Sequence, residues 1–461
     1  MSEQNSSLST TERTQRYYFA AWRWHFYAGL FVIPFLIMLT VTGLIMMVSA
    51  QQFNQMGLVG DVVITGEPLP ISHQAKQALA AVPNGKLDRY VAPEAANRPA
   101  FFAIKQGKAV MNVAVDPYNG DVLNVIDKTQ TLYAITNDIH GELLIGDFGD
   151  WMVEAASSMT ILLIVTGLYL WLSKMGWRSF VPELAAKGRA AWKSWHGVLG
   201  TWISLFLLLF VLSGLAWAGV WGGKFVQPWS SFPVERKAKL WSSDMTHASL
   251  NHGPLDEVPW GLELTPMPIS GTTEGAPGVP KPVALDSVVQ WAAANGFVGQ
   301  YKVTLPRGKK GVYTVSVDGR NEDSVSPEKD RTLHLDQYSG NVLADIRYGD
   351  YPLLAKTMAW GIGLHKGMAG TWNFILNLVL LSMILFTCIS GIVMWWKRRP
   401  TGAGRLVAPP LPQDMPLWKG AFLVALFISM AFPLGGLTLL AVIAVDLLIV
   451  TRIPALKKAF S

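Results

Sequence analysis

Hydrophobic residues are concentrated in six long runs along the 461-residue chain, and polar segments of very different lengths separate them. The runs cover Phe26–Val48, Trp151–Leu172, Gly197–Val220, Trp372–Trp396, Leu417–Phe432 and Gly436–Val450. Each of the first four exceeds the roughly 18 apolar residues that mark a membrane-spanning helix. The last two are shorter and flank a turn composition, Pro-Leu-Gly-Gly, which indicates a helical hairpin. The pattern therefore predicts an α-helical integral membrane protein with about six spans.

Two long polar segments, about 51–149 and 223–365, have the pattern of small α+β domains. The first combines a helical pattern near His73–Val82 with strand patterns near Leu87–Val91, Phe101–Lys105 and Val110–Val115. The second combines a helical pattern near Leu285–Asn295 with strand patterns near Tyr301–Leu305, Val312–Val317 and Thr332–Leu335. Both then carry Asp-x-Tyr-x-Gly followed by Val-Leu, at Asp116–Gly120 and at Asp336–Gly340. The motif predicts a strand–turn–strand, because Gly accepts a positive φ angle and the Asp side chain can cap the turn.

The hydrophobic runs repeat as well. A Trp-His pair opens the first run at His25 and the third run at His196, and a glycine follows each histidine after four residues. Pairs of a hydroxyl residue and a glycine recur at matching depths, as Thr42-Gly43, Ser213-Gly214, Thr166-Gly167 and Ser390-Gly391. Each half of the chain is therefore predicted to consist of a span, a small α+β domain and a second span.

This duplication gives a layout in six parts. They are a cytoplasmic arm with the first span (1–50), a first exported domain (51–149), spans two and three with a basic loop (150–222), a second exported domain (223–369), span four (370–400) and a C-terminal helical hairpin (416–452).

Basic residues lie beside the hydrophobic runs and predict the orientation. They gather in the N-terminal arm, between the second and third runs, after the fourth run and at the C-terminus. All four groups fall on one side if the spans alternate, so both termini are predicted to be cytoplasmic in a bacterial inner membrane. A signal-peptidase-like Val48-Ser49-Ala50 follows the first run, but that run is much longer than a usual signal core, which favours a retained anchor.

Composition narrows the class of protein further. Only 15% of the residues are charged, where about 25% is usual for soluble proteins, and the net charge of +6 comes from residues at the run ends, so nucleic acid is not a predicted partner. A single cysteine, Cys388, excludes an intramolecular disulfide and any cysteine-based zinc or iron–sulfur site.

Four of the eight histidines lie at run ends and form two repeat-related pairs. His25 and His196 lie at the cytoplasmic ends, and His140 and His365 precede the second and fourth runs at the outer face. Two neutral imidazoles that face each other across a helical bundle can bind a haem iron from both sides. The alternative is ordinary interfacial anchoring by Trp-His, with small residues serving as packing points.

The other titratable residues carry weaker signals. His73 and His334 are interpreted as structural. His247 and His252 lie five residues apart in an exported loop, where they suggest a metal or substrate contact. Glu154 and Asp446 are acidic residues within apolar runs and could belong to a proton path, although snorkelling or pairing with neighbouring basic residues near the span ends is the simpler interpretation.

The paired spans around an Asp-x-Tyr-x-Gly domain resemble the PepSY-associated transmembrane family. The doubled chain with its C-terminal hairpin is similar to the iron-regulated branch of bacterial inner-membrane proteins in that family, which includes a ferric-siderophore reductase. The resemblance spans about residues 20–400. It implies two PepSY-like periplasmic domains and a protein with two b haems that passes electrons across the membrane to siderophore-bound ferric iron.

We therefore predict a haem-dependent ferric-siderophore reductase, an oxidoreductase of iron transport. The haem at His25 and His196 would accept electrons from a cytoplasmic or quinol donor, and the haem at His140 and His365 would reduce the external substrate. The cytoplasmic segments are too short for a flavin or nucleotide domain, so the donor is a separate molecule. One alternative is a non-redox membrane protein that regulates an exported protease, and another is a transporter built from the repeat.

Overall fold

The computed structural model describes residues 10–52, 60–232, 243–252, 257–317, 320–321, 324–399, 406–409, 418–445, 448–449 and 452–454. The chain forms two compact units. The helical unit comprises Met1–Leu44, Asp138–Val226 and Ile375–Ser461, and the sheet unit comprises Ile45–Asn137 and Gln227–Phe374.

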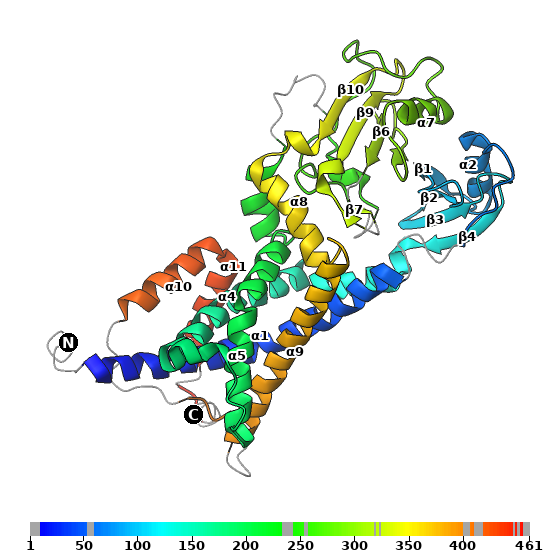
Figure 1. The fold of residues 1–461 in the computed structure, drawn as a ribbon. Helices are drawn as coiled ribbons and strands as arrows, with labels where there is room; N and C mark the ends of the chain where they lie inside the picture. Colours follow the sequence, from blue (N-terminus) through cyan, green and yellow to red (C-terminus); the bar gives the residue numbers. More distant parts are fainter. Residues whose placement is uncertain are drawn as a thin grey trace. The chain divides into compact units, whose positions relative to one another are not determined.

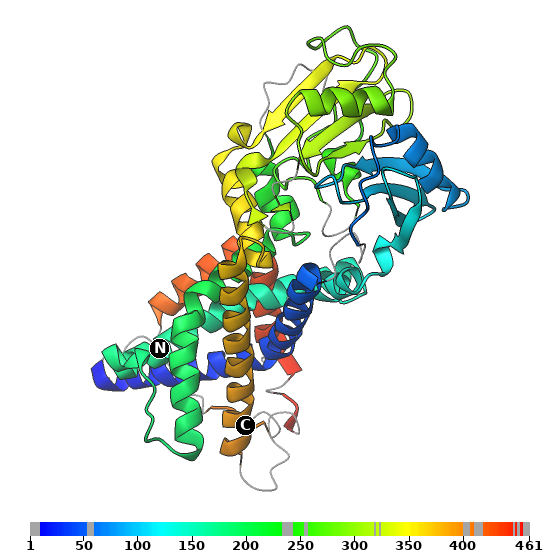
Figure 2. The same cartoon turned by 45° about the vertical axis from the view of Figure 1, so that its right-hand side comes forward.

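Four long helices dominate the helical unit (Figures 1 and 2). They are α1 (Thr10–Gln52), α4 (Asp147–Met175), α5 (Gly188–Leu215) and α9 (Thr371–Arg398). All four are long and apolar enough to cross a membrane, and they contain the first, second and fourth predicted runs and most of the third, which continues past the end of α5. The prediction of a membrane-type helical protein is confirmed at this level.

The C-terminal hairpin consists of α10 (Lys419–Ala431) and α11 (Pro433–Val445), which pack against α4. Pro433 is the first residue of α11, a position where its missing N–H needs no partner. Each helix has 13 residues and rises about 20 Å, less than the about 30 Å of a hydrocarbon core. Neither is long enough to be counted as a candidate span among the described residues.

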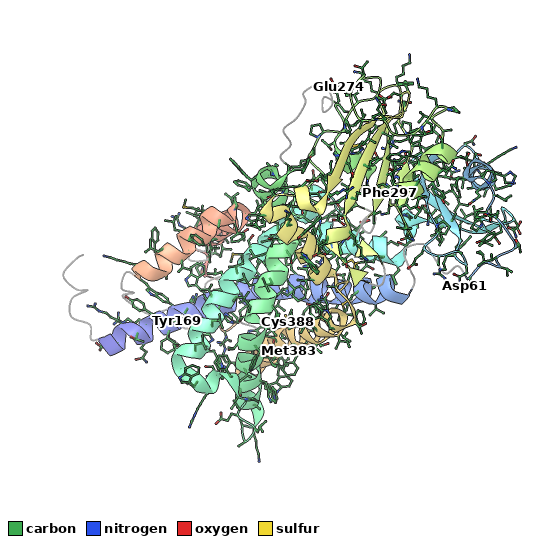
Figure 3. All side chains as sticks on the ribbon, turned by 45° about the horizontal axis from the view of Figure 1, so that its top comes forward. Asp61, Tyr169, Glu274, Phe297, Met383 and Cys388 are labelled. Carbon is green, nitrogen blue, oxygen red and sulfur yellow. The ribbon has the colours of Figure 1, made fainter. Side chains whose placement is uncertain are left out.

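The core of the helical unit is formed by side chains from all of its long helices. Val32 of α1, Ile203 and Leu207 of α5 and Ile384 of α9 are buried in it. Cys388 lies in the same core on α9, near Met383 (Figure 3), as a free and buried thiol. The residues that face this core recur at helical spacing, so the hydrophobic pattern explains the packing.

The sheet unit is built on one antiparallel sheet of eight strands, ordered β10-β9-β6-β5-β1-β2-β3-β4. The first four strands in the chain are β1 (Lys86–Val91), β2 (Ala100–Gln106), β3 (Ala109–Val115) and β4 (Val122–Asp127). Their counterparts are β5 (Lys302–Thr304), β6 (Val312–Val317), β9 (Arg331–Asp336) and β10 (Val342–Arg347). Each repeat is a four-stranded meander, and the two meet where β1 pairs antiparallel with β5. The repeat predicted from the sequence is thus present in the topology.

One helix precedes each meander, α2 (Ile71–Ala80) in the first and α7 (Leu285–Ala294) in the second. The two helices contact each other, and one hydrophobic core joins both repeats. Phe102 and Ile104 of β2 and Leu333 and Leu335 of β9 are fully buried in it. The two polar segments, which spans two and three separate in the sequence, therefore share a single sheet and a single core.

The two Asp-x-Tyr-x-Gly motifs form the same turn. The Tyr118 N–H donates to Asp116 Oδ1 at 2.8 Å, and the Tyr338 N–H donates to Asp336 Oδ1 at 2.8 Å. Gly120 and Gly340 have φ angles of 81° and 75°, a region that other residues rarely adopt. The predicted strand–turn–strand is confirmed in both repeats.

Shorter elements connect the units and complete the sheet unit. In the helical unit they are η3 (Gly176–Phe180) and η4 (Trp221–Val226), and α3 (Leu132–Glu142) runs from the sheet unit into the helical unit. In the sheet unit they are α6 (Gln227–Ser230), α8 (Leu353–Lys366), the paired β7 (Arg320–Asn321) and β8 (Ser324–Val325), and the short turns η2 (Lys128–Gln130), η5 (His247–Leu250), η6 (Pro327–Lys329) and η7 (Tyr348–Asp350).

Candidate functional site

His25 of α1 and His196 of α5 face each other within the helical unit. Their ring centroids are 6.4 Å apart and their planes are nearly perpendicular, at 85°. The two residues are separated by 171 positions in the chain (196 − 25) and come from the equivalent helices of the two repeats. The structure thus brings together the first of the two predicted histidine pairs.

Hydrogen bonds at Nδ1 define the protonation of His196. Its Nδ1 lies 3.1 Å from the carbonyl oxygen of Thr387 and 2.9 Å from Ser390 Oγ. A carbonyl oxygen can only accept, so Nδ1 carries the proton in the neutral ring. Nε2 is then the unprotonated nitrogen, with its lone pair available to a metal.

His25 makes the equivalent contact with α4. Its Nδ1 lies 3.1 Å from Thr166 Oγ1, and that hydroxyl donates its own proton to the Leu162 carbonyl at 2.7 Å. Because the hydroxyl proton is used within the helix, the oxygen accepts from the imidazole. His25 is therefore protonated at Nδ1, like His196.

A glycine follows each of these hydroxyl residues and leaves space for the ring. A Cβ atom on Gly167 would lie 2.9 Å from His25 Cε1, closer than real contacts allow. A Cβ atom on Gly391 would lie 3.6 Å from His196 Cε1. Glycine is therefore required at Gly167 for His25 to lie against the helix backbone, whereas a Cβ atom at Gly391 would only be in ordinary contact with His196.

His140 of α3 repeats this arrangement in a third place. Its Nδ1 lies 2.8 Å from Thr42 Oγ1, which donates to the Met38 carbonyl at 2.7 Å. A Cβ atom on Gly43 would lie 3.8 Å from His140 Cε1. Burial lowers the pKa of His140 to about 4, so the ring is neutral at neutral pH. Three of the four predicted residues thus share one geometry.

The fourth predicted residue, His365, lies near the C-terminal end of α8. It belongs to the sheet unit, whereas His140 belongs to the helical unit. The pairing of His140 with His365 therefore stays a prediction from the duplication. The neighbouring Lys366 forms an ion pair within the sheet unit, with Nζ 3.9 Å from Glu257 Oε2.

His247 and His252 have separate partners in the sheet unit. His247 Nε2 lies 2.9 Å from His334 Nε2, and the outer nitrogens of this buried pair contact the Thr265 carbonyl and the Thr314 hydroxyl. His252 instead contacts Asp88. Across the parts of the chain that the structure describes, no group of three or more His, Cys, Asp or Glu could hold a metal ion. His247 and His252 are thus each accounted for by a neighbouring side chain.

The buried pair of His247 and His334 should make the stability of the sheet unit depend on pH. Burial lowers the pKa of His247 to about 4 and lowers that of His334 as well, whereas an unfolded histidine has a pKa of about 6.5. The unfolded chain binds more protons below pH 6.5, so stability is full above that pH and is lost as the pH falls toward 4. At pH 5.5 we expect the sheet unit to unfold a few degrees lower than at pH 7.5, since each histidine contributes about 1 kcal/mol.

Thermal unfolding of the full-length protein at both pH values measures this effect. The double variant His247→Gln, His334→Gln serves as the control, because it has no buried imidazoles in this place. An equal pH dependence in the variant and the wild type would assign the effect to other groups.

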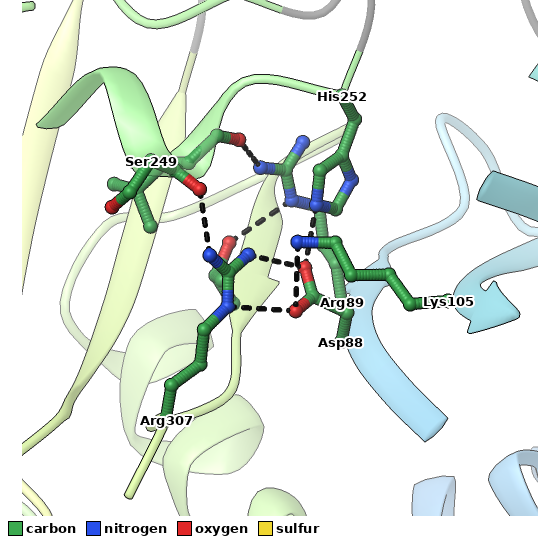
Figure 4. Close-up of polar contacts among 8 residues, drawn as sticks. Asp88, Arg89, Lys105, Ser249, His252 and Arg307 are labelled. Atoms are coloured by element: carbon green, nitrogen blue, oxygen red, sulfur yellow. Dashed lines mark hydrogen bonds and ion pairs between the residues drawn. The ribbon is translucent and has the colours of Figure 1, made fainter. Parts of the chain in front are cut away.

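A second polar cluster in the sheet unit had no signal in the sequence. Asp88 of β1 is buried and receives Arg307 through two bonds, Nε to Oδ1 at 2.9 Å and Nη2 to Oδ2 at 2.8 Å (Figure 4). Lys105 Nζ lies 3.3 Å from Oδ1, and His252 donates to Oδ2. Burial alone would raise the pKa of Asp88, but the bonds from His252 and Arg307 outweigh it and hold the pKa below its usual value. The cluster links β1 and β2 of the first repeat to the segment that follows β5, beside the β1–β5 pair.

Of the two acidic residues in the apolar runs, the structure describes Glu154. Glu154 of α4 is buried and accepts from the backbone N–H groups of Val220 at 3.0 Å and Trp221 at 3.2 Å. It therefore caps the chain that follows α5 through backbone contacts, which the sequence did not predict. Asp446 lies outside the described residues.

Residues 22–398 match the model of a protein family described as the PepSY-associated TM region. The match includes the whole eight-stranded sheet and all four candidate histidines. A comparison with curated proteins finds no match.

Proposed function

The chain belongs to the PepSY-associated transmembrane family, and from this premise we propose that it is a di-haem b reductase of the bacterial inner membrane. In this proposal it is a FoxB-like protein that passes electrons to ferric iron bound in a periplasmic siderophore. Both termini are cytoplasmic, and the two repeats of the sheet unit act as PepSY-like domains.

The single observation that carries the proposal is the facing pair of His25 and His196. Two imidazoles that bound one metal ion through Nε2 would have ring centroids about 6 Å apart. Each metal–nitrogen bond contributes about 2 Å to this distance, and each Nε2 lies about 1 Å from its ring centre. The measured centroid separation is 6.4 Å. The distance, the shared tautomer and the glycine beside each ring all fit a flat metal cofactor held between the imidazoles.

In this proposal, His25 and His196 hold one haem and His140 and His365 hold the other. Haem iron, when bound, supplies reversible one-electron transfer. The protein residues supply the two imidazoles, keep the proton on the nitrogen away from the iron, and exclude water through the apolar core around α1, α5 and α9. His140 supports the second site because its contacts with Thr42 repeat those of His25 with Thr166.

The direction of transfer follows from the chemistry of the two sides. A charged donor cannot cross about 30 Å of hydrocarbon, so two sites at opposite ends of the spans provide a route. The donor is a separate cytoplasmic protein or a membrane quinol. One electron converts the ferric substrate to ferrous iron, which hard oxygen ligands hold less tightly, so the metal can leave the siderophore.

The test is a spectrum of the purified full-length protein, oxidised and then reduced with dithionite. We expect about two b haems per chain by pyridine haemochrome, and reoxidation of the reduced protein when a ferric siderophore is added. Trapping the product with a ferrous chelator measures the reduced iron. A protein without haem, made with ample haem supply, would overturn the proposal and favour a non-redox regulator of an exported protease.

A further inference from the structure

The candidate histidines share a feature that the haem proposal does not require. His25, His140 and His196 each have a hydroxyl oxygen within 3.1 Å of Nδ1, supplied by Thr166, Thr42 and Ser390. We propose that these three hydroxyl residues are positioning residues, which fix the ring plane of the imidazoles and help to hold their tautomer, at His196 together with the Thr387 carbonyl. This inference rests on the proposed function, because it concerns how the same ligands are held.

The hydroxyls can act only as acceptors toward the imidazoles. Thr166 and Thr42 donate to carbonyls four residues earlier in their own helices, at 2.7 Å in both cases. Ser390 donates to the Thr387 carbonyl at 2.8 Å, the same carbonyl that His196 contacts. Each hydroxyl has one proton, and the helix backbone takes it, so the oxygen lone pairs face the ring.

An acceptor at Nδ1 has two consequences for a bound metal. The proton stays on Nδ1, so Nε2 keeps the lone pair that a metal ligand needs. A hydrogen bond from Nδ1 also makes the imidazole a stronger electron donor, which favours the ferric state of the iron. The hydroxyl therefore acts on the metal through the imidazole, without contact of its own.

The recurrence of hydroxyl–glycine pairs beside three histidines supports a functional role for the hydroxyls. Hydroxyl–glycine pairs occur at Thr42-Gly43, Thr166-Gly167 and Ser390-Gly391 beside the three rings. Ser213-Gly214 occupies the fourth equivalent position, and Ser213 makes the same bond to a carbonyl four residues earlier, Leu209, at 2.6 Å. Other hydroxyls in these helices bond their own backbone without a histidine neighbour. Thr160 is one, since it donates to the Ala156 carbonyl at 2.8 Å.

Thr160 therefore provides a matched control on the same helix as Thr166. Thr166→Val removes the hydroxyl and keeps the shape, Thr166→Ser restores the hydroxyl, and Thr160→Val removes a buried hydroxyl that contacts no imidazole. Each variant is purified as the full chain. The haem content, the midpoint potentials from a redox titration, and the low-spin ferric signals in electron paramagnetic resonance are then measured.

In Thr166→Val we expect one midpoint potential to rise and one low-spin signal to change shape, because that signal depends on the angle between the two imidazole planes. Thr166→Ser is expected to match the wild type, and Thr160→Val is expected to leave both readouts unchanged. If Thr166→Val does not accumulate, Thr42→Val makes the same test at His140.

Two outcomes separate this inference from the proposed function. A wild type without haem overturns the proposed function, and the positioning role falls with it. A wild type with two haems whose potentials and signals are unchanged in Thr166→Val and in Thr42→Val overturns the positioning role alone.

Discussion

Replacing His196 with alanine is expected to remove one of two bound haems and to abolish electron transfer through the protein to the ferric substrate. The reason is geometric, because His25 is the only candidate ring described opposite His196, at 6.4 Å between centroids. One imidazole can bind iron, but the second axial bond is lost, and b-type haem has no covalent attachment to compensate. The haem content is expected to fall from about two per chain to about one.

The pyridine haemochrome of purified His196→Ala measures this loss. Variants of the other candidate histidines test which residues hold which haem. His25→Ala should remove the same haem, so the double variant should retain about one. His140→Ala should remove the other haem, so the double variant of His196 and His140 should retain none. The control is His73→Ala, because His73 is exposed on α2 and far in the chain from every candidate ligand. Two haems in His196→Ala would contradict the assignment.

Local patterns in the sequence predict much of this fold. The four long helices follow from apolar runs of sufficient length, and the two turns at Asp116 and Asp336 follow from the positive φ angle that only glycine accepts readily. The pairing of His25 with His196 follows from the duplication. Such features depend on neighbouring residues or on a repeat, and the sequence alone shows local patterns and repeats.

Contacts between distant segments are what the sequence does not predict. The pairing of β1 with β5 merges two predicted domains into one sheet, yet the sequence of neither strand indicates which strand it pairs with. Asp88 and Arg307 lie 219 positions apart and carry no motif. Thr166 was visible as a repeat position, but its bond to His25 depends on the relative rotation of two helices. A hydroxyl–glycine pair at equal depth in each repeat is the signal that could have indicated it.

The second large effect concerns the cluster at Asp88. Asp88→Asn is expected to destabilise the sheet unit by about 2–4 kcal/mol, because it removes the charge that Arg307 and Lys105 share. His252 also loses its acceptor, and its side chain has no exposed surface through which water could replace the carboxylate. Breaking a buried ion pair on one side costs more than the pair contributes, since the remaining charges stay desolvated. The partial exposure of Arg307 and Lys105 sets the estimate below that of a fully buried pair.

Thermal unfolding of the full-length variant measures this loss, which corresponds to a decrease of roughly 5–10 °C. Asp61→Asn is the matched control, because Asp61 forms one ion pair with Arg98 at 3.0 Å and its side chain is 64% exposed. An exposed pair contributes less than about 1 kcal/mol, so the control should stay close to the wild type. Equal shifts in the two variants would mean that burial does not strengthen the contribution of Asp88. A large shift confined to Asp88→Asn would instead show that the charge cluster beside the β1–β5 pair is a main contributor to the stability of the sheet that the two repeats share.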